Sequence, residues 1–559
     1  MNKHTIDEII TNIQLIRQEE QKVKKPNTHA ADMKKGFQIS KLACSQAQEV
    51  AISPFMKNML HAFGDLKGDE RLLVDSPETK AEKWIHETIE TLLKKYNPSP
   101  TGKLYDTTLP IDSIQLYNTD CWDNFKDNMR DIQPGQADER KKVSLEYGKP
   151  TKDIDIVWKL KHDITFQKAV DVVVELLPSV RASDEFHQIN IPFMTKHTNV
   201  SYPYWANDRT RVSPDLKKKY HVETYAELTM KQAKELPLDK VYNYNVSTAY
   251  GRNQRGKGRF LVAISRIANL IFNCLEGVEI EAYKSRCPIF AGYNDAPFLK
   301  RVLQEMTDFC NKNNYVLANW DQSKYDLHVS KGFIELLGAI SMFKANGTRS
   351  KQIALKRAAT MSKTWLVNGM TGKLEEINGR IFSGFIDTNR GGGIINEIIT
   401  LYCLMKQDPD YTKKITYPAK YSSLVMGDDH LFIYDPKTFD KDKFVKDMLS
   451  LGFEVNPEKQ QYGTFFLQNR LFKNGKDMVM AYSWTRVYRS SMFKETSKGL
   501  GPFGWLEAEA QQCYKLVEVP DFLKIVVNLI APFDKHKLGA GLPVEYIKEQ
   551  VRKEDAEEI

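Results

Sequence analysis

The segment from residue 422 to residue 435, SSLVMGDDHLFIYD, limits the folds open to this chain more than any other. Two apolar runs, Leu424–Met426 and Leu431–Tyr434, flank the turn Gly427-Asp428-Asp429. Glycine and aspartate suit a tight reversal, and β-branched and aromatic residues suit strands, so this pattern predicts a β-hairpin. Adjacent carboxylates at its tip repel each other unless a cation lies between them, and divalent ions bind carboxylate oxygens. A polar turn facing water explains the same residues, so other segments must decide.

The composition sets outer bounds on the kind of protein. A chain of 559 residues with 42% hydrophobic and 11% aromatic residues is too long for one core and too apolar for a disordered protein. The net charge of +8 permits nucleic-acid binding without establishing it. Seven scattered cysteines exclude a disulfide framework and a structural zinc site. Because no apolar run is long enough to span a membrane and no signal peptide is visible, we expect a soluble intracellular protein.

The N-terminal third is expected to be largely helical. Apolar spacing predicts a helix within Met1–Lys25 and a second from an N-cap at Ser76 to Tyr96, before a turn-rich boundary at residues 97–102. Residues 165–177 predict a buried element. The aromatic stretch 201–205 precedes several basic residues: Arg209, Arg211 and Lys217 to Lys219. This stretch fits stacking on bases, and it fits an ordinary surface loop equally well.

From residue 315 the pattern is that of an antiparallel sheet with helices. A strand at 315–320 ends in Asp321, and helical spacing follows at 333–340 and 394–405. After the hairpin come a helix at 444–449 and a strand at 453–455. This βαββαβ order predicts a sheet with helices packed on one face and its first strand beside the hairpin. We therefore expect Asp321 to end near Asp428.

Three carboxylates from adjacent strand ends suit one kind of chemistry. Asp321, with Asp326 five residues later, forms the second acidic pair beside the Asp428-Asp429 turn. Such a set can hold two divalent ions about 3.5–4 Å apart, one on the attacking and one on the leaving oxygen of a nucleotidyl transfer. A strand-end cap is the simpler explanation of Asp321 alone, and the combination with the hairpin favours the metal site.

Two other segments fit a nucleotide substrate. Ser383-Gly384 and Thr388 supply a flexible turn and hydroxyl groups ahead of a helix. Residues 251–266 hold five basic side chains that could bind phosphate oxygens, and a solvated basic loop is the alternative. The stretch nearly matches a P-loop, but Gly258 stands where serine or threonine must bind Mg²⁺, and residues 242–250 are too polar for the expected buried strand that feeds such a loop. An ATPase fold is therefore not expected.

Together these segments resemble the ordered motifs of viral RNA-dependent RNA polymerases. The matching motifs are F at 252–266, A at 321–326, B at 383–396, C at 427–429, D around 449–459 and E around 464–470. The likeness is greatest to polymerases of double-stranded RNA viruses, picobirnaviruses first and partitiviruses next, and it spans about residues 250–470. It implies an α+β right-hand fold with fingers, a βαββαβ palm, a thumb and a largely helical N-terminal extension.

The resemblance also implies roles for individual residues. Asp321, Asp428 and Asp429 would bind Mg²⁺, for which Mn²⁺ can substitute, and Lys459 would be the general acid that protonates pyrophosphate. The implied nucleotide contacts are Arg252, Lys257 and Arg259 for the triphosphate, and Asp326, Ser383, Thr388 and Asn396 for the sugar side. Many such enzymes have asparagine four residues after the motif B threonine, where this chain has Gly392 within Gly391-Gly392-Gly393, a poor helix start. Asn389 or Asn396 is expected to substitute for it.

The function that follows is template-directed transfer of nucleotides from NTPs to an RNA 3′ end, in transcription and replication of a viral RNA genome. The alternatives are a reverse transcriptase and a non-catalytic, capsid-associated RNA-binding protein; Gly427 and Asp326 argue against the first, and the three carboxylates against the second. Expected partners are RNA template and product, NTPs and a viral capsid protein, with a monomeric chain in the virus particle and the host-cell cytoplasm.

The expected regions are an N-terminal extension at 1–100 that bridges fingers and thumb, fingers at 101–310, a palm at 311–470 in which 345–380 return to the fingers, and a thumb at 471–559.

Overall fold

Residues 423–434 form the predicted hairpin, at the edge of a four-stranded antiparallel sheet with strand order β6-β7-β3-β8. The strands are β3 (Val316–Ser323), β6 (Ser423–Met426), β7 (Asp429–Tyr434) and β8 (Glu454–Tyr462). Strand β3 lies between β7 and β8, so the predicted contact between the first strand and the hairpin is confirmed. The computed structural model describes residues 3–28, 52–67, 77–96, 152–186, 199–254, 257–367, 372–385, 387–415, 423–474, 477–493 and 518–535, with a few isolated positions between them.

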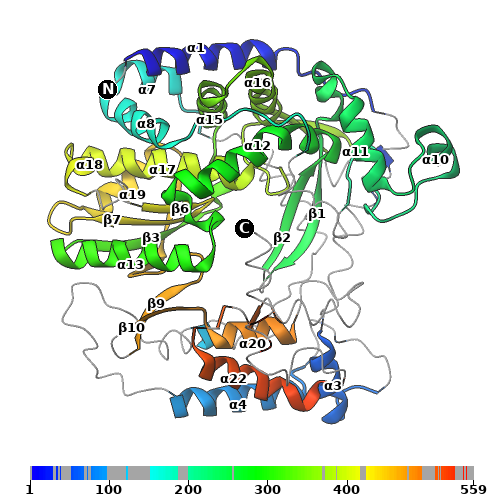
Figure 1. The fold of residues 1–559 in the computed structure, drawn as a ribbon, viewed down its shortest axis with the longest axis vertical. Helices are drawn as coiled ribbons and strands as arrows, with labels where there is room; N and C mark the ends of the chain where they lie inside the picture. The colour runs from blue at the N-terminus through cyan, green and yellow to red at the C-terminus, as the bar shows by residue number, and fades with distance from the viewer. Residues whose placement is uncertain are drawn as a thin grey trace.

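The two helices that the βαββαβ pattern predicted pack on one face of this sheet, as expected, and a helix that precedes the pattern contacts its first strand. Helices α17 (Thr388–Gln407) and α19 (Lys441–Ser450) pack on β6, β7 and β8, while α13 (Ala296–Asn313) contacts β3, and the sheet lies between α17 and α13 in the view of Figure 1. Trp320 packs edge-on against Phe444 of α19 and Phe432 of β7. Because side chains alternate along a strand, Asn319 and Asp321 face the opposite way, away from α19.

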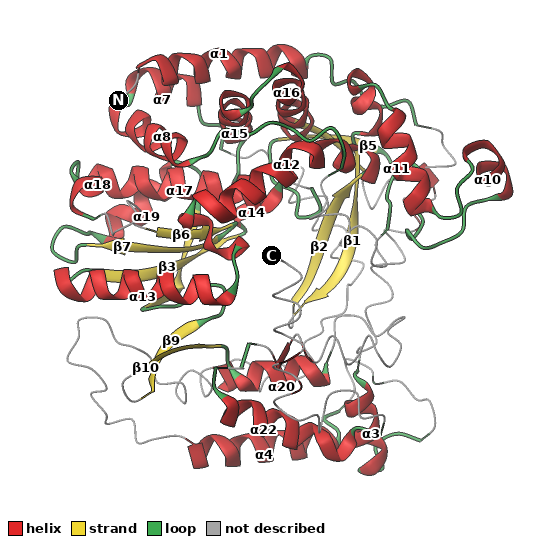
Figure 2. Ribbon diagram, viewed as in Figure 1, coloured by secondary structure: helices red, strands yellow, loops and turns green. Residues whose placement is uncertain are grey.

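A second four-stranded sheet has the strand order β2-β1-β4-β5. Its strands are β1 (Val246–Gln254), β2 (Lys257–Ile264), β4 (Lys363–Val367) and β5 (Leu374–Asn378). The basic stretch expected as a loop is therefore mostly a hairpin, which extends toward the lower helices in Figure 2. The polar start of β1 does form a buried strand, because Ser247 and Thr248 lie where β1 pairs with β4. Arg266 is also not available for phosphate, since it is buried in an ion pair with Asp208 (3.6 Å).

The aromatic stretch at 201–205 belongs to the core and is not a base-stacking surface. Tyr202 and Trp205 are buried and pack with Val246 and Val367. The basic residues after it are exposed, with Lys217 to Lys219 on the short helix α10 (Pro214–Tyr220), which buries no side chain and projects from the molecule in Figure 1. The buried element predicted at 165–177 is helix α8 (Ile164–Leu176).

The first hundred residues contact two separate parts of the molecule. Helix α1 (Lys3–Glu20) packs on α15 (Lys331–Lys344) and α16 (Thr348–Ser362). Helices α3 (Pro54–Ala62) and α4 (Lys80–Tyr96) share a core with α20 (Trp484–Met492) and α22 (Pro520–Ile530), at the bottom of Figure 1. Helix α4 begins later than predicted, because Thr79 and Glu82 form a reciprocal capping box there. Ser76 and the boundary at 97–102 lie outside the described residues.

The remaining helices and one further hairpin complete the described chain. These are α7 (Ile156–His162), α11 (Tyr225–Glu235), η2 (Leu238–Tyr244), α12 (Arg266–Arg286), η3 (Pro288–Tyr293), α14 (Tyr325–His328), α18 (Tyr411–Lys414), η4 (Ala531–Phe533) and the hairpin β9 (Arg470–Asn474) and β10 (Asp477–Ala481). Among the described residues, no helix combines the length and apolarity that a membrane crossing requires.

The docking of α1 generates a stability prediction. Burial tends to raise the pKa of the Glu19 carboxyl, but hydrogen bonds from Lys22, Lys356 and Tyr242 outweigh it and lower the pKa to about 2. Since the folded pKa lies below the usual 4.5, the ionised carboxylate stabilises the fold above about pH 4.5, and this contribution is lost as the pH falls toward 2. We expect Glu19→Gln to lower the melting temperature at pH 7 and less so at pH 3. An equal loss at both pH values in thermal melts would contradict this account.

Candidate active site

The hairpin tip is a two-residue turn in which glycine is required. Met426 pairs with Asp429, which leaves Gly427 and Asp428 as the turn, and Gly427 has a positive φ of 62°. Two-residue turns of this kind favour glycine at the first position, since it adopts positive φ without a Cβ clash. Asp428 is exposed at the tip, and Asp429, the first residue of β7, is half-buried. The two carboxylates therefore start from very different environments.

The Asp429 carboxylate is held by both neighbouring segments. Asn319 on β3 donates its side-chain amide to Oδ1, and the backbone N–H of Leu467 donates to Oδ2 (3.1 Å). Burial raises the pKa of the Asp429 carboxyl to about 6, the Asp428 charge adds to the rise, and these hydrogen bonds oppose it. A bound cation would offset the burial cost and the repulsion between the two carboxylates.

Asp321 lies at an irregularity of β3 that frees it from pairing. The register with β8 shifts between Trp320 and Gln322, which pair with Gln460 and Val455, so β8 has extra residues opposite Asp321. Bulges of this kind redirect side chains and are frequent beside active sites. Lys459 is one of these extra residues, and its Nζ lies 3.6 Å from Asp321 Oδ2. The predicted proximity of Lys459 to the acidic site is thus present in the structure.

The backbone brings Asp321 and Asp429 to adjacent strand ends. Asn319 pairs with Leu431, and continuing this register by two residues sets Asp321 across from Asp429. Directly opposed residues have Cβ atoms about 5 Å apart, a spacing that a shared cation can bridge. No group of three Asp, Glu, His or Cys side chains in the described chain is already gathered around a cation position. The donor set nevertheless fits a divalent ion, because Asp321 already faces the ammonium of Lys459 and Asp429 is destabilised as an anion.

Asn396 lies beneath the turn. Its Nδ2 donates to the backbone carbonyls of Gly427 (3.1 Å) and Asp428 (3.2 Å), and its Oδ1 accepts from Gln322 of β3 (2.7 Å). The side chain has no exposed surface. Asn396 thus joins β3 to the turn, and its expected contact with the nucleotide stays a prediction.

A buried polar cluster extends this support below the hairpin. His430 Nδ1 lies within hydrogen-bonding distance of Asn396 Oδ1 (3.2 Å) and Thr400 Oγ1 (3.1 Å). Glu397 accepts from the Ser423 hydroxyl, and its Oε2 lies 3.0 Å from His430 Nε2. Side chains of α17, β6 and β7 thus meet under the turn in one network. Buried networks of this kind specify a single arrangement of the elements that they join.

The three glycines after Thr388 lie inside α17, not at its start as expected. Helix α17 begins at Thr388, and Gly392 and Gly393 face the turn at Gly427, while Gly391 faces Leu337. A Cβ at Gly392 would stand 3.5 Å from Gly427 Cα, so any longer side chain there would displace the turn. Tyr325 donates its hydroxyl to the Gly392 carbonyl (2.6 Å) from the segment that carries Asp326. Gly392 therefore departs from the usual asparagine because this helix packs directly on the turn.

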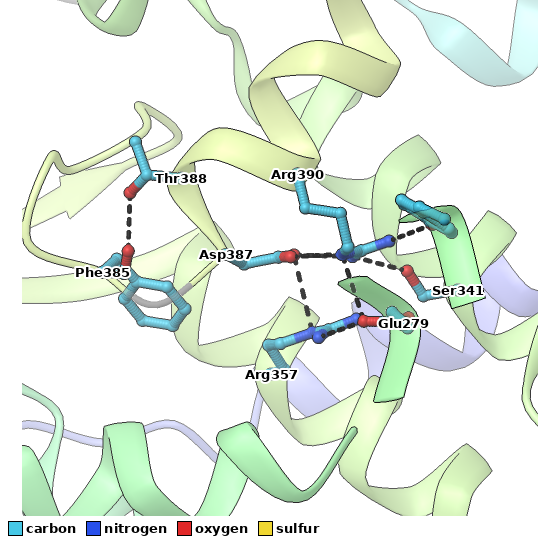
Figure 3. A network of polar contacts seen from close by, with 8 residues as sticks. Glu279, Ser341, Arg357, Phe385, Asp387, Thr388 and Arg390 are labelled. Carbon is cyan, nitrogen blue, oxygen red and sulfur yellow. Dashed lines mark hydrogen bonds and ion pairs between the residues drawn. The ribbon is translucent and has the colours of Figure 1, made fainter. Parts of the chain in front are cut away.

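The loop before α17 is closed by its own side chains. Thr388 donates its hydroxyl to the backbone carbonyls of Phe382 and Phe385, the latter at 2.7 Å (Figure 3). Gly384 pairs with β2 through its N–H to Val262 (3.0 Å), and a Cβ there would meet Ala263 Cα at 2.7 Å. Gly384 thus permits close approach to the basic hairpin, where the sequence suggested backbone flexibility. Ser383 and Asn389 are exposed, and Asn389 Oδ1 lies 3.6 Å from the Cβ position of Gly427.

Of the remaining expected nucleotide contacts, three lie on the β1–β2 hairpin and one lies in α14. Arg252 pairs with Arg259 across the β1–β2 hairpin, and Lys257 is the first residue of β2; the side chains of all three lie outside the described part of the chain. Asp326 is half-buried in α14, and its carbonyl accepts from the N–H of Ile381 (3.0 Å). This bond links motif A to the segment leading into motif B.

Three contributors to the site were not expected from the sequence. Asn319 and Leu467 fix Asp429, and Tyr325 fixes Gly392. Two signals were visible: Asn319 is a polar residue in an apolar strand two positions before Asp321, and Tyr325 is adjacent to Asp326. The role of Leu467 comes from its backbone, so no residue type could reveal it.

Comparisons with known proteins identify the architecture. No protein-family model and no curated protein sequence matches this chain. Crystal structures of the RNA-dependent RNA polymerase of a human picobirnavirus do match, with 14% sequence identity. The insertion-loop deletion mutant has a TM-score of 0.58 and covers 93% of this chain and 94% of its own, and the other structure has a TM-score of 0.59 with 92% of each chain covered.

The chain has the fold of a right-hand polymerase. The predicted α+β class and the likeness to picobirnavirus polymerases are confirmed as a matter of fold. The sheet β6-β7-β3-β8 has the strand order of the predicted palm, and the expected bounds of fingers, palm and thumb stay predictions. Helix α1 packs on α15 and α16, while α3 and α4 pack on α20 and α22.

The position of Asn396 generates a kinetic prediction. We expect Asn396→Ala to lower kcat for nucleotide addition about 10- to 100-fold with little change in KM, because small displacements of a catalytic group have effects of this size. Asn396→Asp is the matched variant: it keeps the acceptor for Gln322 but loses both donors to the turn, and it should be as slow as the alanine variant. Wild-type kcat in either variant, measured by single-nucleotide extension, would contradict the assigned role.

The environment of Asp429 generates a pH prediction for the metal-free protein. Its folded pKa of about 6 lies above the usual 3.8, so the folded state keeps this proton longer than the unfolded state, and stability falls as the pH rises between these values. Asp429→Asn has no such cost. In EDTA we expect the melting temperature of the variant, relative to wild type, to increase from pH 4 to pH 6.5 and then level off. A difference that does not vary with pH would refute this environment.

Proposed function

We propose that this protein is an RNA-dependent RNA polymerase that transfers nucleotides from NTPs to the 3′ end of RNA on an RNA template. The observation that carries the proposal is the pairing of β3 with β7 inside a right-hand fold, which sets Asp321 across from Asp429 and beside the Asp428 tip. Acidic residues on adjacent palm strands suit a phosphoryl transfer in which positioning and charge stabilisation supply the catalysis. The similar structures are those of an RNA-dependent RNA polymerase, which supports the same reaction.

The acidic residues would bind the metal ions, and Lys459 would act as the proton donor. Asp321, Asp428 and Asp429 would hold two Mg²⁺ ions, or Mn²⁺ in their place, which activate the 3′-hydroxyl and offset charge on the leaving pyrophosphate. Lys459 would give a proton to the pyrophosphate, and its present distance from Asp321 puts it within reach of that region. Its ion pair with Asp321 would then have to open when the site is filled.

Residues of motifs A, B and F would bind the incoming nucleotide. Arg252, Lys257 and Arg259 on the β1–β2 hairpin would contact the triphosphate. Asp326, Ser383 and Thr388 would line the sugar side. Asn389 would take the place of the usual motif B asparagine, since it is exposed and lies beside Gly427, whereas Asn396 is buried. A ribose 2′-hydroxyl read by polar groups would distinguish NTPs from dNTPs.

The proposed biological setting follows from this activity. The chain would transcribe and replicate a double-stranded RNA genome inside a virus particle and in the host-cell cytoplasm, as a monomer in contact with capsid protein. The region boundaries remain those proposed from the sequence: extension 1–100, fingers 101–310, palm 311–470 and thumb 471–559. Contacts of α1 with α15 and α16, and of α3 and α4 with α20 and α22, support a bridging extension.

The decisive experiment is template-directed synthesis with a metal-ligand variant. The purified chain, a single-stranded RNA template, NTPs and Mg²⁺ should yield complementary RNA. We expect Asp428→Ala to lower the rate at least about a thousandfold, because loss of a metal ligand removes several kcal/mol of charge stabilisation. Template binding should persist, since it depends on basic residues and phosphate contacts.

Two controls make the result specific. Asp442→Asn changes an exposed aspartate on α19 and should leave the rate unchanged. A parallel reaction with dNTPs tests the reverse transcriptase alternative, which predicts efficient DNA synthesis. An active Asp428→Ala enzyme would refute the metal assignment, and a wild-type chain that binds RNA but adds no nucleotide would favour the non-catalytic alternative.

A further inference from the structure

Four buried charged side chains form a closed ring behind the nucleotide side of the site (Figure 3). Arg357 of α16 donates to both oxygens of Glu279 of α12 (2.8 and 3.1 Å). Arg390 of α17 donates to both oxygens of Asp387 (2.6 and 2.8 Å). Two further contacts close the ring: Arg390 Nε lies 3.1 Å from Glu279, and Arg357 Nε lies 3.5 Å from Asp387.

The ring is balanced in charge and sealed from water. Each of the four side chains is at most 4% exposed, and two guanidinium groups offset two carboxylates. Glu276 is also buried nearby, and burial together with the Asp387 charge raises the pKa of its carboxyl well above the usual range. Arg390 uses further donors on Tyr283 (3.1 Å) and Ser341 (3.0 Å). The geometry of Arg390 is therefore fixed from several helices at once.

Asp387 binds the arginines of the ring and does not cap its own helix. It occupies the N-cap of α17, where an aspartate usually accepts hydrogen bonds from the first backbone N–H groups. Its carboxylate makes no such cap bond and turns to the two arginines. The orientation of the first turn of α17 is thus set by charges on α12 and α16, and not by local capping.

That first turn carries an exposed residue beside the Gly427-Asp428 turn. Asp387 and Arg390 point inward, while Asn389 between them is exposed and lies 3.6 Å from the Cβ position of Gly427. Thr388 closes the preceding loop onto Phe385. Because neighbours on one helical turn move together, a shift of Arg390 also shifts Asn389 against the catalytic hairpin.

We propose that the ring of Glu279, Arg357, Asp387 and Arg390 is a positioning device that couples the fingers helices α12 and α16 to the nucleotide-reading segment 383–389. It thereby sets how strictly the site selects ribonucleotides. The inference rests on the proposed polymerase function and extends it: these four residues do not touch the nucleotide, and they determine where the residues that do touch it are held. Precise placement of this kind requires buried, well-packed support.

The test breaks the fingers side of the ring without leaving a lone charge. Glu279→Met with Arg357→Met removes one charge of each sign and keeps similar volume, a change that buried ion pairs often tolerate. At a temperature below its melting point, we expect this variant to show a KM for NTPs raised about fivefold or more. The ratio of kcat/KM for NTP over dNTP should fall by a similar factor, with a smaller change in kcat.

The matched control lies on the same helix. Lys356, adjacent to Arg357, pairs with Glu19 of α1 (2.9 Å), and both side chains are largely buried. Glu19→Gln with Lys356→Met should change the melting temperature but leave the NTP over dNTP ratio at its wild-type value. A folded ring variant with KM and ratio within twofold of wild type would overturn the proposal, as would an equal loss of selectivity in the control.

Two milder variants test the proposal if the ring variant does not fold. Tyr283→Phe and Ser341→Ala each remove one uncharged hydrogen-bond acceptor of Arg390, and each should raise the NTP KM about twofold and lower the ratio. Unchanged values in both would overturn the proposal. If the wild-type chain itself incorporates no nucleotide, the proposed polymerase function fails first, so the two failures are distinguishable.

Discussion

The contact on which the site depends is the packing of the Gly427 turn against the glycine-rich first turns of α17. The two backbones approach closely where neither Gly392 nor Gly427 has a side chain, and a Cβ on Gly392 would stand 3.5 Å from Gly427 Cα. Asn396 then converts proximity into a fixed arrangement by donating to both turn carbonyls. Because Gln322 of β3 donates to the same amide oxygen, motifs A, B and C are joined through one side chain.

This arrangement permits an unfavourable accumulation of negative charge. Asp428 and Asp429 are adjacent, and Asp321 approaches from the neighbouring strand. Burial raises the pKa of the Asp429 carboxyl. The protein offsets part of this cost with Asn319, the Leu467 amide and the ammonium of Lys459. A cation bound there would offset the repulsion between the three carboxylates, as expected of a site that binds divalent ions.

The palm was predictable from the sequence because its signals are local. Apolar strands, the Gly-Asp-Asp turn and helical spacing gave the order β3, α17, hairpin, α19 and β8, and their pairing confirmed that Asp321 lies beside the hairpin. What the sequence did not reveal has physical causes that lie between segments. Polar residues at 247–248 form a buried strand because β4 pairs with it, and Asn396 turns inward because the glycines bring the turn over it. The ring that holds Arg390 joins residues more than a hundred positions apart, which spacing within a motif cannot reveal.

The central claim is that Asp321, Asp428 and Asp429 act together as a divalent-metal site supported from below by α17. The most direct measurement is anomalous diffraction from crystals of the protein with Mn²⁺ and a non-hydrolysable NTP. The account predicts two manganese peaks about 3.5–4 Å apart, in contact with the three aspartates, with Lys459 released from Asp321. Bound nucleotide with no manganese at these carboxylates would contradict it.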